Sequence, residues 1–247
     1  TSFHQTLPEY AWRYALPRKI SDQYAIRRYG FHGISHQSVV KQAASFLKTP
    51  VNKLNLITIH LGNGASISAI KKGICVDTTM GMTPLEGLVM GTRPGDLDPG
   101  ILTLLARKGW NQEALETMLN QDSGMKGLCG TNDFREILQN KEEGNEEAEM
   151  ALELYCYRVR KTIGSFSTVI GPVDALVFTG GVGENVPWVR ERSVRGMEWM
   201  NIQLDPDMND HAEAPCAIHS KDSQTKILVL PSDEEWEMAS QAAELIL

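Results

Sequence analysis

Cysteines are few in this sequence, and no two of them are close together. Cys75, Cys129, Cys156 and Cys216 are spread along the chain without a CxxC pair. This spacing predicts neither a zinc ribbon nor a dense disulfide framework. A reducing compartment suits such a chain, and we therefore expect a cytoplasmic location.

The sequence also lacks long apolar runs and an excess of basic residues. No stretch has membrane-spanning length, and the start shows no signal-peptide pattern. The net charge is -7, and the lysines and arginines are dispersed rather than gathered into a stripe. These features argue against a membrane protein and against a nucleic-acid-binding surface. The remaining composition, 42% hydrophobic and 22% charged over 247 residues, is typical of a soluble globular protein.

The central part of the chain is a stretch rich in glycine and proline at residues 77–100. Its sequence, DTTMGMTPLEGLVMGTRPGDLDPG, has five glycines, three prolines, four acidic residues and one arginine, Arg93. This mixture predicts a long loop, and long loops in compact domains tend to be functional. The guanidinium of Arg93 could bind a carboxylate or phosphate through two hydrogen bonds, or it could form an ion pair with Asp96 or Asp98 that pins the loop. Composition favours neither interpretation.

A second candidate, His32, lies in the glycine-flanked segment RRYGFHGISH. Ser35 is a suitable N-cap for a helix over about residues 36–47, which places His32 just before a helix N-terminus, where backbone N–H groups favour anions. The spacing of His32 and His36 resembles half of a zinc motif. However, the expected Glu is absent and Gly33 interrupts the helix, so zinc is not predicted.

Glycine turns follow two of the strand patterns. NLITIH at residues 55–60 runs into HLGNGAS, and SISAIKKGICVDTT then alternates as a hairpin does. The turn at residues 62–64 suits contact with phosphate, although Asn-Gly is also a common turn signal, and the plain turn is favoured. Further on, VDALVFTGGVGEN predicts a buried strand, a glycine turn and a helix, an order that often places phosphate or nucleoside against backbone. Its glycines do not form GxGxxG, so a dinucleotide fold is not indicated.

Helices are predicted in the second half of the chain, most clearly in the long amphipathic pattern of residues 144–170. Before it, SGMKGLCGTN predicts a loop, and Thr131 or Asn132 is the expected cap of a helix to about residue 140. Arg135 in that helix either touches a ligand or lies on the surface, and surface is favoured. In the tail, a strand at 226–230 precedes a helix in which Glu234 either caps the N-terminus, the default interpretation, or helps to hold a metal.

Taken together, these motifs resemble the acetate kinase family of short-chain carboxylate kinases. RYGFHGISH, HLGNGAS, the whole 77–100 block, NDFR, FTGGVGEN and PSDEE occur in the family's order and at similar separations. The resemblance implies an α/β fold, a ribonuclease H-like domain of the sugar kinase, Hsp70 and actin type with a mixed five-stranded sheet flanked by helices. It also implies reversible, direct in-line phosphoryl transfer from ATP to acetate, with acetyl phosphate and ADP as products. The acetyl phosphate would serve acetyl-CoA biosynthesis. The family further implies that the reaction needs Mg²⁺ and that the protein is a homodimer.

The resemblance implies roles for individual residues. Arg93 is expected to bind the carboxylate and the transferring phosphoryl group, and His32 to hydrogen-bond that group in flight. Phe31 and Pro84 resemble part of the apolar pocket for the substrate's methyl group, and Glu234 resembles the acidic residue linked to magnesium. The residues expected to bind nucleotide are His60, Asn63 and Gly64 in the phosphate loop, Asp133, Phe134 and Arg135 in a nucleotide-contacting triplet, and Gly181, Val182 and Asn185 in the adenosine pocket.

Some parts of the family pattern are missing from this sequence. The family has an N-terminal domain with a glycine- and serine-rich phosphate loop, a second substrate arginine, and an aspartate directly before the threonine that matches Thr1. We therefore expect this chain to be the C-terminal part of a kinase and to be inactive alone. Residues 1–30, which show only short turns, would be a remnant of the inter-domain region. Residues 31–247 would form a nucleotide-binding and dimerisation domain. Ser232 and Asp233 replace the family's usual threonine and asparagine beside Glu234. Two alternatives are a propionate or butyrate kinase, because only half of the methyl pocket is present, and a non-catalytic nucleotide-binding or dimerisation module.

Overall fold

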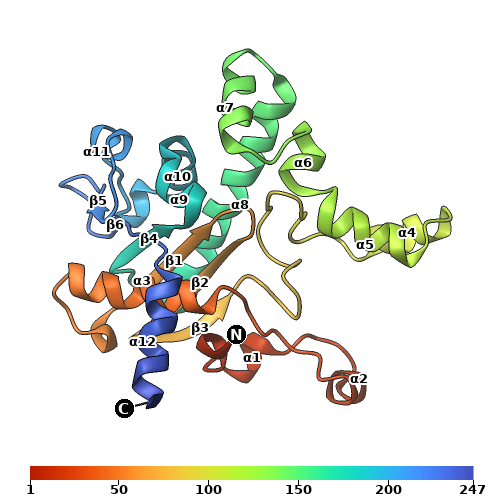
Figure 1. Cartoon of the computed structure of the whole chain (residues 1–247), viewed down its shortest axis with the longest axis horizontal. Coiled ribbons are helices and arrows are strands. Elements are labelled where there is room, and N and C mark those ends of the chain that lie inside the picture. Colours follow the sequence, from red (N-terminus) through yellow and green to blue (C-terminus); the bar gives the residue numbers. More distant parts are fainter. Residues whose placement is uncertain (247) are drawn as a thin grey trace.

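A central mixed β-sheet organises the computed structural model, which describes residues 1–246 and their side chains through Ala243 (Figure 1). Leu247, the last residue of the predicted C-terminal domain, lies outside the described residues. Within them, six strands form one sheet in the order β3-β2-β1-β4-β6-β5. The strands are β1 (Leu56–Leu61), β2 (Ala65–Lys71), β3 (Ile74–Thr78), β4 (Ala175–Thr179), β5 (Cys216–Ala217) and β6 (Lys226–Val229).

Strand β1 joins an antiparallel half of the sheet to a parallel half. It pairs antiparallel with β2, which continues into β3 as the predicted hairpin, and it pairs parallel with β4, which is parallel to β6. Five strands were expected; the sixth is β5, which pairs antiparallel with β6. A strand of two residues is too short to produce a hydrophobic period that a sequence can show.

Helices cover both faces of the sheet because the buried side chains of its strands alternate between two cores. Ile57 and Ile59 of β1 belong to the larger core under α8 (Glu146–Ile170), the predicted long helix. Leu56 of β1 and Val177 of β4 belong to the smaller core under α3 (Gly33–Phe46). Helix α12 (Glu234–Ile246) packs against α3. This period of two is expected for strands that are buried on both faces.

Shorter helices surround this framework, and in Figure 1 those of residues 100–121 extend away from the sheet. Within residues 1–246, no helix combines the length and apolar character that crossing a membrane requires. The further helices and 3-10 turns are η1 (Ser2–His4), α1 (Glu9–Trp12), α2 (Arg18–Gln23), η2 (Val51–Lys53), α4 (Gly100–Arg107), α5 (Gln112–Gln121), α6 (Gly124–Cys129), α7 (Phe134–Glu142), α9 (Gly180–Asn185), α10 (Pro187–Val194), η3 (Glu198–Met200) and α11 (Pro206–Asp210).

The predicted cap of the first long helix is wrong. Helix α3 starts at Gly33, and its N-cap residue is His32, which has a left-handed backbone with φ of 89°. Ser35 lies inside the helix, and its hydroxyl oxygen is 2.8 Å from Nδ1 of His60. The side chain of Ser35 therefore makes a tertiary hydrogen bond instead of the predicted cap.

The other predicted caps also differ from the structure. Asp133, rather than Thr131 or Asn132, caps α7, because its carboxylate accepts from the backbone N–H of Arg135 at 3.0 Å. In the tail, Asp233 Oδ1 accepts from the N–H of Trp236 at 3.3 Å, so the default interpretation of Glu234 as the cap is wrong. A carboxylate at the N-cap satisfies an N–H that the helix leaves unpaired.

Candidate active site

Two loops meet at the carboxyl ends of the central strands. Strands β1 and β4 are parallel neighbours, with His60 opposite Thr179, so the turn at 62–64 lies beside the first residues of α9. In open α/β sheets, ligands bind at the carboxyl ends of the parallel strands. The predicted phosphate loop and the predicted adenosine segment are therefore brought to one edge of the sheet.

A cleft of about 660 Å³ opens between these loops and the start of α7. Its volume is in the range of small-molecule sites. The cleft brings together predicted residues from three separate motifs, and it adds Gly62, Asn132 and Val186, which were not among the residues expected to bind nucleotide. The lining residues are Gly62, Asn63, Asn132, Asp133, Phe134, Arg135, Gly181, Val182, Asn185 and Val186.

Asn63 connects this cleft to the central loop. The side-chain amide of Asn132 donates to Asn63 Oδ1 at 2.9 Å, and the N–H of Gly91 donates to the Asn63 carbonyl at 2.9 Å. A Cβ atom at Gly91 would lie 2.1 Å from Asn63 Oδ1, so the approach needs a glycine there. Asn132 is the first residue of the quoted NDFR motif, although only the three residues after it were expected to contact nucleotide.

Asp133 and Arg135 form an exposed ion pair at the edge of the cleft. Arg135 Nη2 lies 2.7 Å from Asp133 Oδ2, and the Arg135 side chain is 91% exposed. The hydrogen bonds from Arg135 lower the pKa of Asp133 to about 2, so its carboxylate stays charged at neutral pH. Arg135 thus lies on the surface, the interpretation that the sequence favoured, and it also lines the cleft; its contact with a ligand stays a prediction.

Helix α6 holds the arginine-bearing loop in place. The N–H groups of Met125 and Lys126 donate to the carbonyls of Met90 and Gly91, at 2.9 Å each. These N–H groups belong to the first turn of a helix, which has no internal acceptor for them. The prediction of a loop for SGMKGLCGTN is therefore wrong at residues 124–129, and the missed helix has a clear function in bracing residues 90–93.

Arg93 does not pin its loop through an ion pair. Within the described residues, its Nη1 donates to the carbonyl oxygen of Pro84 at 2.8 Å, and no salt bridge reaches Asp96 or Asp98. Those two carboxylates accept instead from backbone N–H groups of the same loop. The other end of the guanidinium is therefore available to an anionic ligand.

His32 and Arg93 approach the same point above the glycine turn. A Cβ atom built on Gly64 would lie 3.2 Å from Nε2 of His32 and 3.4 Å from Nη2 of Arg93. Nitrogen atoms of two different loops thus converge beside the predicted phosphate loop. The spacing of His32 and Arg93 in the sequence did not predict that they would lie close together. Only the family resemblance assigned both residues to one site.

The histidines of the site are uncharged at neutral pH. The ring of His32 stacks on that of His60, with centroids 4.4 Å apart. Burial lowers the pKa of His32 to about 3, helped by the nearby His60 and Arg93, and burial lowers the pKa of His60 to about 4. These imidazoles can therefore hydrogen-bond a ligand without adding positive charge to the site.

Phe31 and Pro84 lie next to these two nitrogen-bearing side chains. Phe31 directly precedes His32 and packs, half-buried, against the larger core. Pro84 is half-buried and is joined to Arg93 through its carbonyl. Neither residue lines the 660 Å³ cleft, and their role in a pocket for a methyl group stays a prediction.

Glu184, which sequence reasoning missed, connects α9 to the loop that precedes α12. Its carboxylate accepts from the N–H of Gly180 and from the N–H of Ser232, at 2.9 Å each. The hydroxyl of Ser232 lies 3.3 Å from that of Ser35, which contacts His60. The PSDEE segment is therefore anchored at the same edge of the sheet as the histidines.

Glu234 begins α12 two residues after that anchor. It is half-buried, and its carboxylate makes no hydrogen bond or ion pair with another of residues 1–243. The described residues contain no group of three or more His, Cys, Asp or Glu that could hold a metal ion. A kinase Mg²⁺ is usually held by one or two carboxylates together with substrate phosphates and waters, so a single unpaired carboxylate fits that ion.

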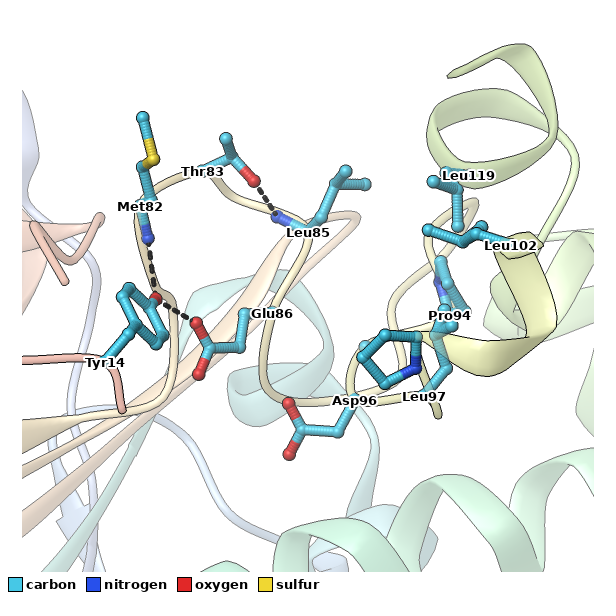
Figure 2. A pocket seen from close by; sticks show the side chains of 12 residues that line it. Tyr14, Met82, Thr83, Leu85, Glu86, Pro94, Asp96, Leu97, Leu102 and Leu119 are labelled. Atoms are coloured by element: carbon cyan, nitrogen blue, oxygen red, sulfur yellow. Dashed lines mark hydrogen bonds between the residues drawn. The ribbon is translucent and has the colours of Figure 1, made fainter. Parts of the chain in front are cut away.

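A separate cleft of about 450 Å³ lies beside the central loop (Figure 2). Leucine side chains from the loop and from α4 and α5 form one side of it, and on the other the hydroxyl of Tyr14 donates to Glu86 and accepts from the N–H of Met82 at 3.0 Å. Burial and the contact with Glu86 raise the pKa of Tyr14 to about 12. The lining includes none of the predicted site residues.

Comparisons with known proteins identify the family of the chain. The model of the acetokinase family matches residues 1–240. Acetate kinase of Sulfurovum sp. (strain NBC37-1) is 53% identical over 249 residues, which covers 100% of this chain and 63% of that protein. The crystal structure of Porphyromonas gingivalis acetate kinase has 43% identity and a TM-score of 0.97, and it covers 100% of this chain and 63% of that one. A propionate kinase from Francisella tularensis subsp. tularensis SCHU S4 has 41% identity and a TM-score of 0.92 and covers 97% of this chain and 62% of that one.

The chain thus spans about 63% of the length of these relatives. That this stretch is the C-terminal part of a kinase stays a prediction. The structural matches confirm the predicted fold, a ribonuclease H-like domain of the sugar kinase, Hsp70 and actin type, with the sixth strand as the difference. Because the family model matches nearly the whole sequence, the chain belongs to the acetokinase family.

Proposed function

We propose that this chain provides most of the active site of an acetate kinase, which transfers a phosphoryl group between ATP and acetate to give acetyl phosphate and ADP. The observation that carries the proposal is the convergence of His32 Nε2 and Arg93 Nη2 above Gly64, beside the 660 Å³ cleft. The kinase relatives support the same reaction. The proposed enzyme is a cytoplasmic homodimer, and this chain alone is inactive.

The chemistry requires positioned donors more than covalent participation. In phosphoryl transfer, the attacking and leaving oxygens lie roughly in line, and catalysis comes from alignment and from charge stabilisation around the equatorial oxygens. Arg93 would supply a fixed positive charge, and the neutral His32 would supply one N–H. A carboxylate oxygen is already a nucleophile, so the site needs no strong base.

The nucleotide would occupy the cleft. Asn63 would lie along its phosphates, together with His60 and Gly64, which belong to the same segment but do not line the cleft. Gly181, Val182 and Asn185 of α9 would contact the adenosine, as would the triplet Asp133, Phe134 and Arg135. Glu234 would hold Mg²⁺ through its carboxylate. The ion, when bound, neutralises charge on the phosphates.

Propionate is the second candidate substrate. The propionate kinase of F. tularensis supports it through its fold, with a TM-score of 0.92. Phe31 and Pro84 would form part of the pocket that limits acyl length.

Calorimetric titration of the 247-residue chain with MgADP tests the nucleotide half of the proposal. We expect binding that weakens in Asn185→Ala and in Glu234→Ala, because the first removes a contact from the cleft and the second removes the magnesium carboxylate. Glu235→Ala is the matched control, since Glu235 is the exposed neighbour of Glu234 in the same helical turn. Equal binding by the wild type and both test variants would contradict the assigned site.

Trapping of acyl phosphate by hydroxylamine tests the reaction in the full-length protein. Acetyl hydroxamate is expected, and a comparison of acetate, propionate and butyrate measures the preferred chain length. If none of the three gives a hydroxamate, the kinase proposal fails and the chain is a nucleotide-binding or dimerisation module.

A further inference from the structure

A layer of polar side chains is buried between α3 and the sheet. In the register of β1 and β2, Thr58 lies opposite Ser68 and His60 opposite Ser66, and directly opposite residues project from the same face. Thr58, Ser66 and Ser68 are fully buried, as is His36 of α3. Polar groups in such a place must be hydrogen-bonded to one another, since leaving one unpaired is costly.

Hydrogen bonds connect this layer to the candidate catalytic histidine. Thr58 Oγ1 lies 2.8 Å from Nδ1 of His36, whose Nε2 lies 2.8 Å from Oγ of Ser66. The same Ser66 oxygen lies 2.9 Å from Nδ1 of His32. The series therefore runs from a fully buried threonine to the ring whose other nitrogen faces Gly64.

The number of protons in this series limits the directions of its bonds. Burial lowers the pKa values of His32 and His36, so each neutral ring carries one N–H, and each hydroxyl carries one proton. With these protons, all three hydrogen bonds of the series can form in only two ways. In one, protons point from Thr58 towards His32, and in the other they point from His32 back to Thr58.

The hydroxyl of Thr58 decides between these directions. Within the part of the chain that the structure describes, its hydrogen-bond partner is His36 Nδ1 alone. If His36 donated to Thr58, the threonine's own proton would be buried without an acceptor, which is unfavourable. Thr58 therefore donates to His36 Nδ1, His36 Nε2 donates to Ser66, and Ser66 donates to His32 Nδ1.

We propose that Ser66, supported by His36 and Thr58, is a positioning residue that fixes His32 in the tautomer with its proton on Nε2. This N–H points to the place above Gly64 that Nη2 of Arg93 also approaches. An N–H there can donate to an anionic oxygen, whereas the opposite tautomer would present a lone pair and repel it. The identity of the anion as a phosphoryl group rests on the proposed function; the tautomer itself does not.

Two-bond ¹H–¹⁵N correlation spectra of the 247-residue chain, labelled with ¹⁵N-histidine at neutral pH, test this directly. The protonated and unprotonated nitrogens of a neutral imidazole have well-separated shifts, and His32→Gln assigns the His32 signals by their loss. We expect Nε2 of His32 to be protonated and Nδ1 unprotonated. The reverse pattern, or a mixture of both tautomers in the wild type, would overturn the proposal even if no Ser66 variant folds.

Ser66→Ala and Ser68→Ala form a matched pair of variants. Both serines are fully buried on the same face of β2, but Ser68 pairs with the hydroxyl of Thr78, at 2.9 Å, rather than with a histidine. We expect Ser66→Ala to give a mixture of His32 tautomers and Ser68→Ala to leave the wild-type pattern. An unchanged His32 pattern in folded Ser66→Ala would overturn the role of Ser66.

Kinetics of the full-length protein separate this proposal from the proposed function. Ser66→Ala should lower kcat by about 10- to 100-fold with a smaller change in KM, the range found for outer partners of metal-bound histidines. Ser68→Ala should keep kcat. If the full-length protein is not a kinase but His32 is protonated on Nε2, the proposed function fails and the tautomer assignment stands.

Discussion

The imidazole rings of His32 and His60 are stacked, with their planes inclined by 22°. His4 and His36 lie close to this pair, and burial lowers the pKa of all four below the usual 6.5, to about 4 for His4. At pH values between the lowered and the usual pKa, the unfolded chain binds more protons than the folded one. Acid therefore favours unfolding through this cluster.

The free energy of unfolding should accordingly fall as the pH is lowered from about 6.5 towards 4. Each titrating histidine adds a slope of about 1.4 kcal/mol per pH unit. Urea unfolding of the wild type and of His32→Gln across this range measures the effect, and we expect a flatter dependence in the variant. His211→Gln is the control. The bond to Asp207 raises the pKa of the exposed His211, so this histidine does not contribute to the loss of stability in acid. Parallel curves for the wild type and His32→Gln would contradict the prediction.

Arg93→Ala in the full-length protein should lower the kcat of the proposed reaction by about two to three orders of magnitude, the usual cost of losing one donor to transition-state charge. Arg93→Lys should recover only part of the loss, because an ammonium keeps the charge but cannot reproduce the fork that also holds the Pro84 carbonyl. Arg107→Ala, on the exposed surface of α4, is the control. Near-normal turnover of Arg93→Ala would exclude a catalytic role.

The sequence predicted the elements that depend on local periods. The β1 strand, the β2–β3 hairpin and helix α8 follow from apolar spacing alone, and the observed bounds lie within a few residues of the predicted ones. Features that depend on distant partners were not predictable in this way. Helix α6 is six residues long, and its first N–H groups bond to Met90 and Gly91, more than thirty positions earlier.

The candidate site shows the same division. Asn63, Asp133 and Asn185 belong to motifs that the sequence displays, and the cleft joins them. Glu184 and Ser66 lie within the quoted motifs FTGGVGEN and HLGNGAS, but the sequence analysis gave neither a role, because their contacts are to backbone N–H groups and imidazoles that only the fold brings near. For Ser66, the pairing of β1 with β2, which places it opposite His60, is the signal that could have indicated its role.

Gly91→Ala should weaken MgADP binding and should have little effect on the free energy of unfolding. The added methyl group would lie 2.1 Å from Asn63 Oδ1, an exposed side chain that can move away, so the cost appears as a displaced cleft residue. Gly164→Ala is the control, because a methyl group there meets nothing within 4 Å and lies in α8. That change should raise the free energy of unfolding by about 0.5–1 kcal/mol and leave binding unchanged. Calorimetry with MgADP would contradict the prediction if both variants bound as the wild type does.

Arg190 of α10 should support the 660 Å³ cleft by holding the end of α9 in place. Its guanidinium is buried, and it donates to the carbonyls of Gly183 and Glu184 at the end of α9 and to the side chain and carbonyl of Asn209, at 2.8–3.0 Å. Removal of the arginine takes a donor from all four oxygens. The Asn209 carbonyl keeps the N–H of Ala212 at 3.3 Å, and each of the others that is left unpaired costs about 1–3 kcal/mol.

We therefore expect Arg190→Met to lower the free energy of unfolding by about 3 kcal/mol or more and to weaken MgADP binding, since α9 carries Gly181 and Asn185 of the cleft. Arg192→Met removes an arginine from the same helix, but its partner is the partly exposed Glu153, so the loss should be about 1 kcal/mol or less. Urea unfolding and calorimetry measure the two effects. Similar losses of stability in both variants would contradict the first expectation. Unchanged MgADP binding by folded Arg190→Met would show that the bonds of Arg190 to α9 do not hold the cleft in place.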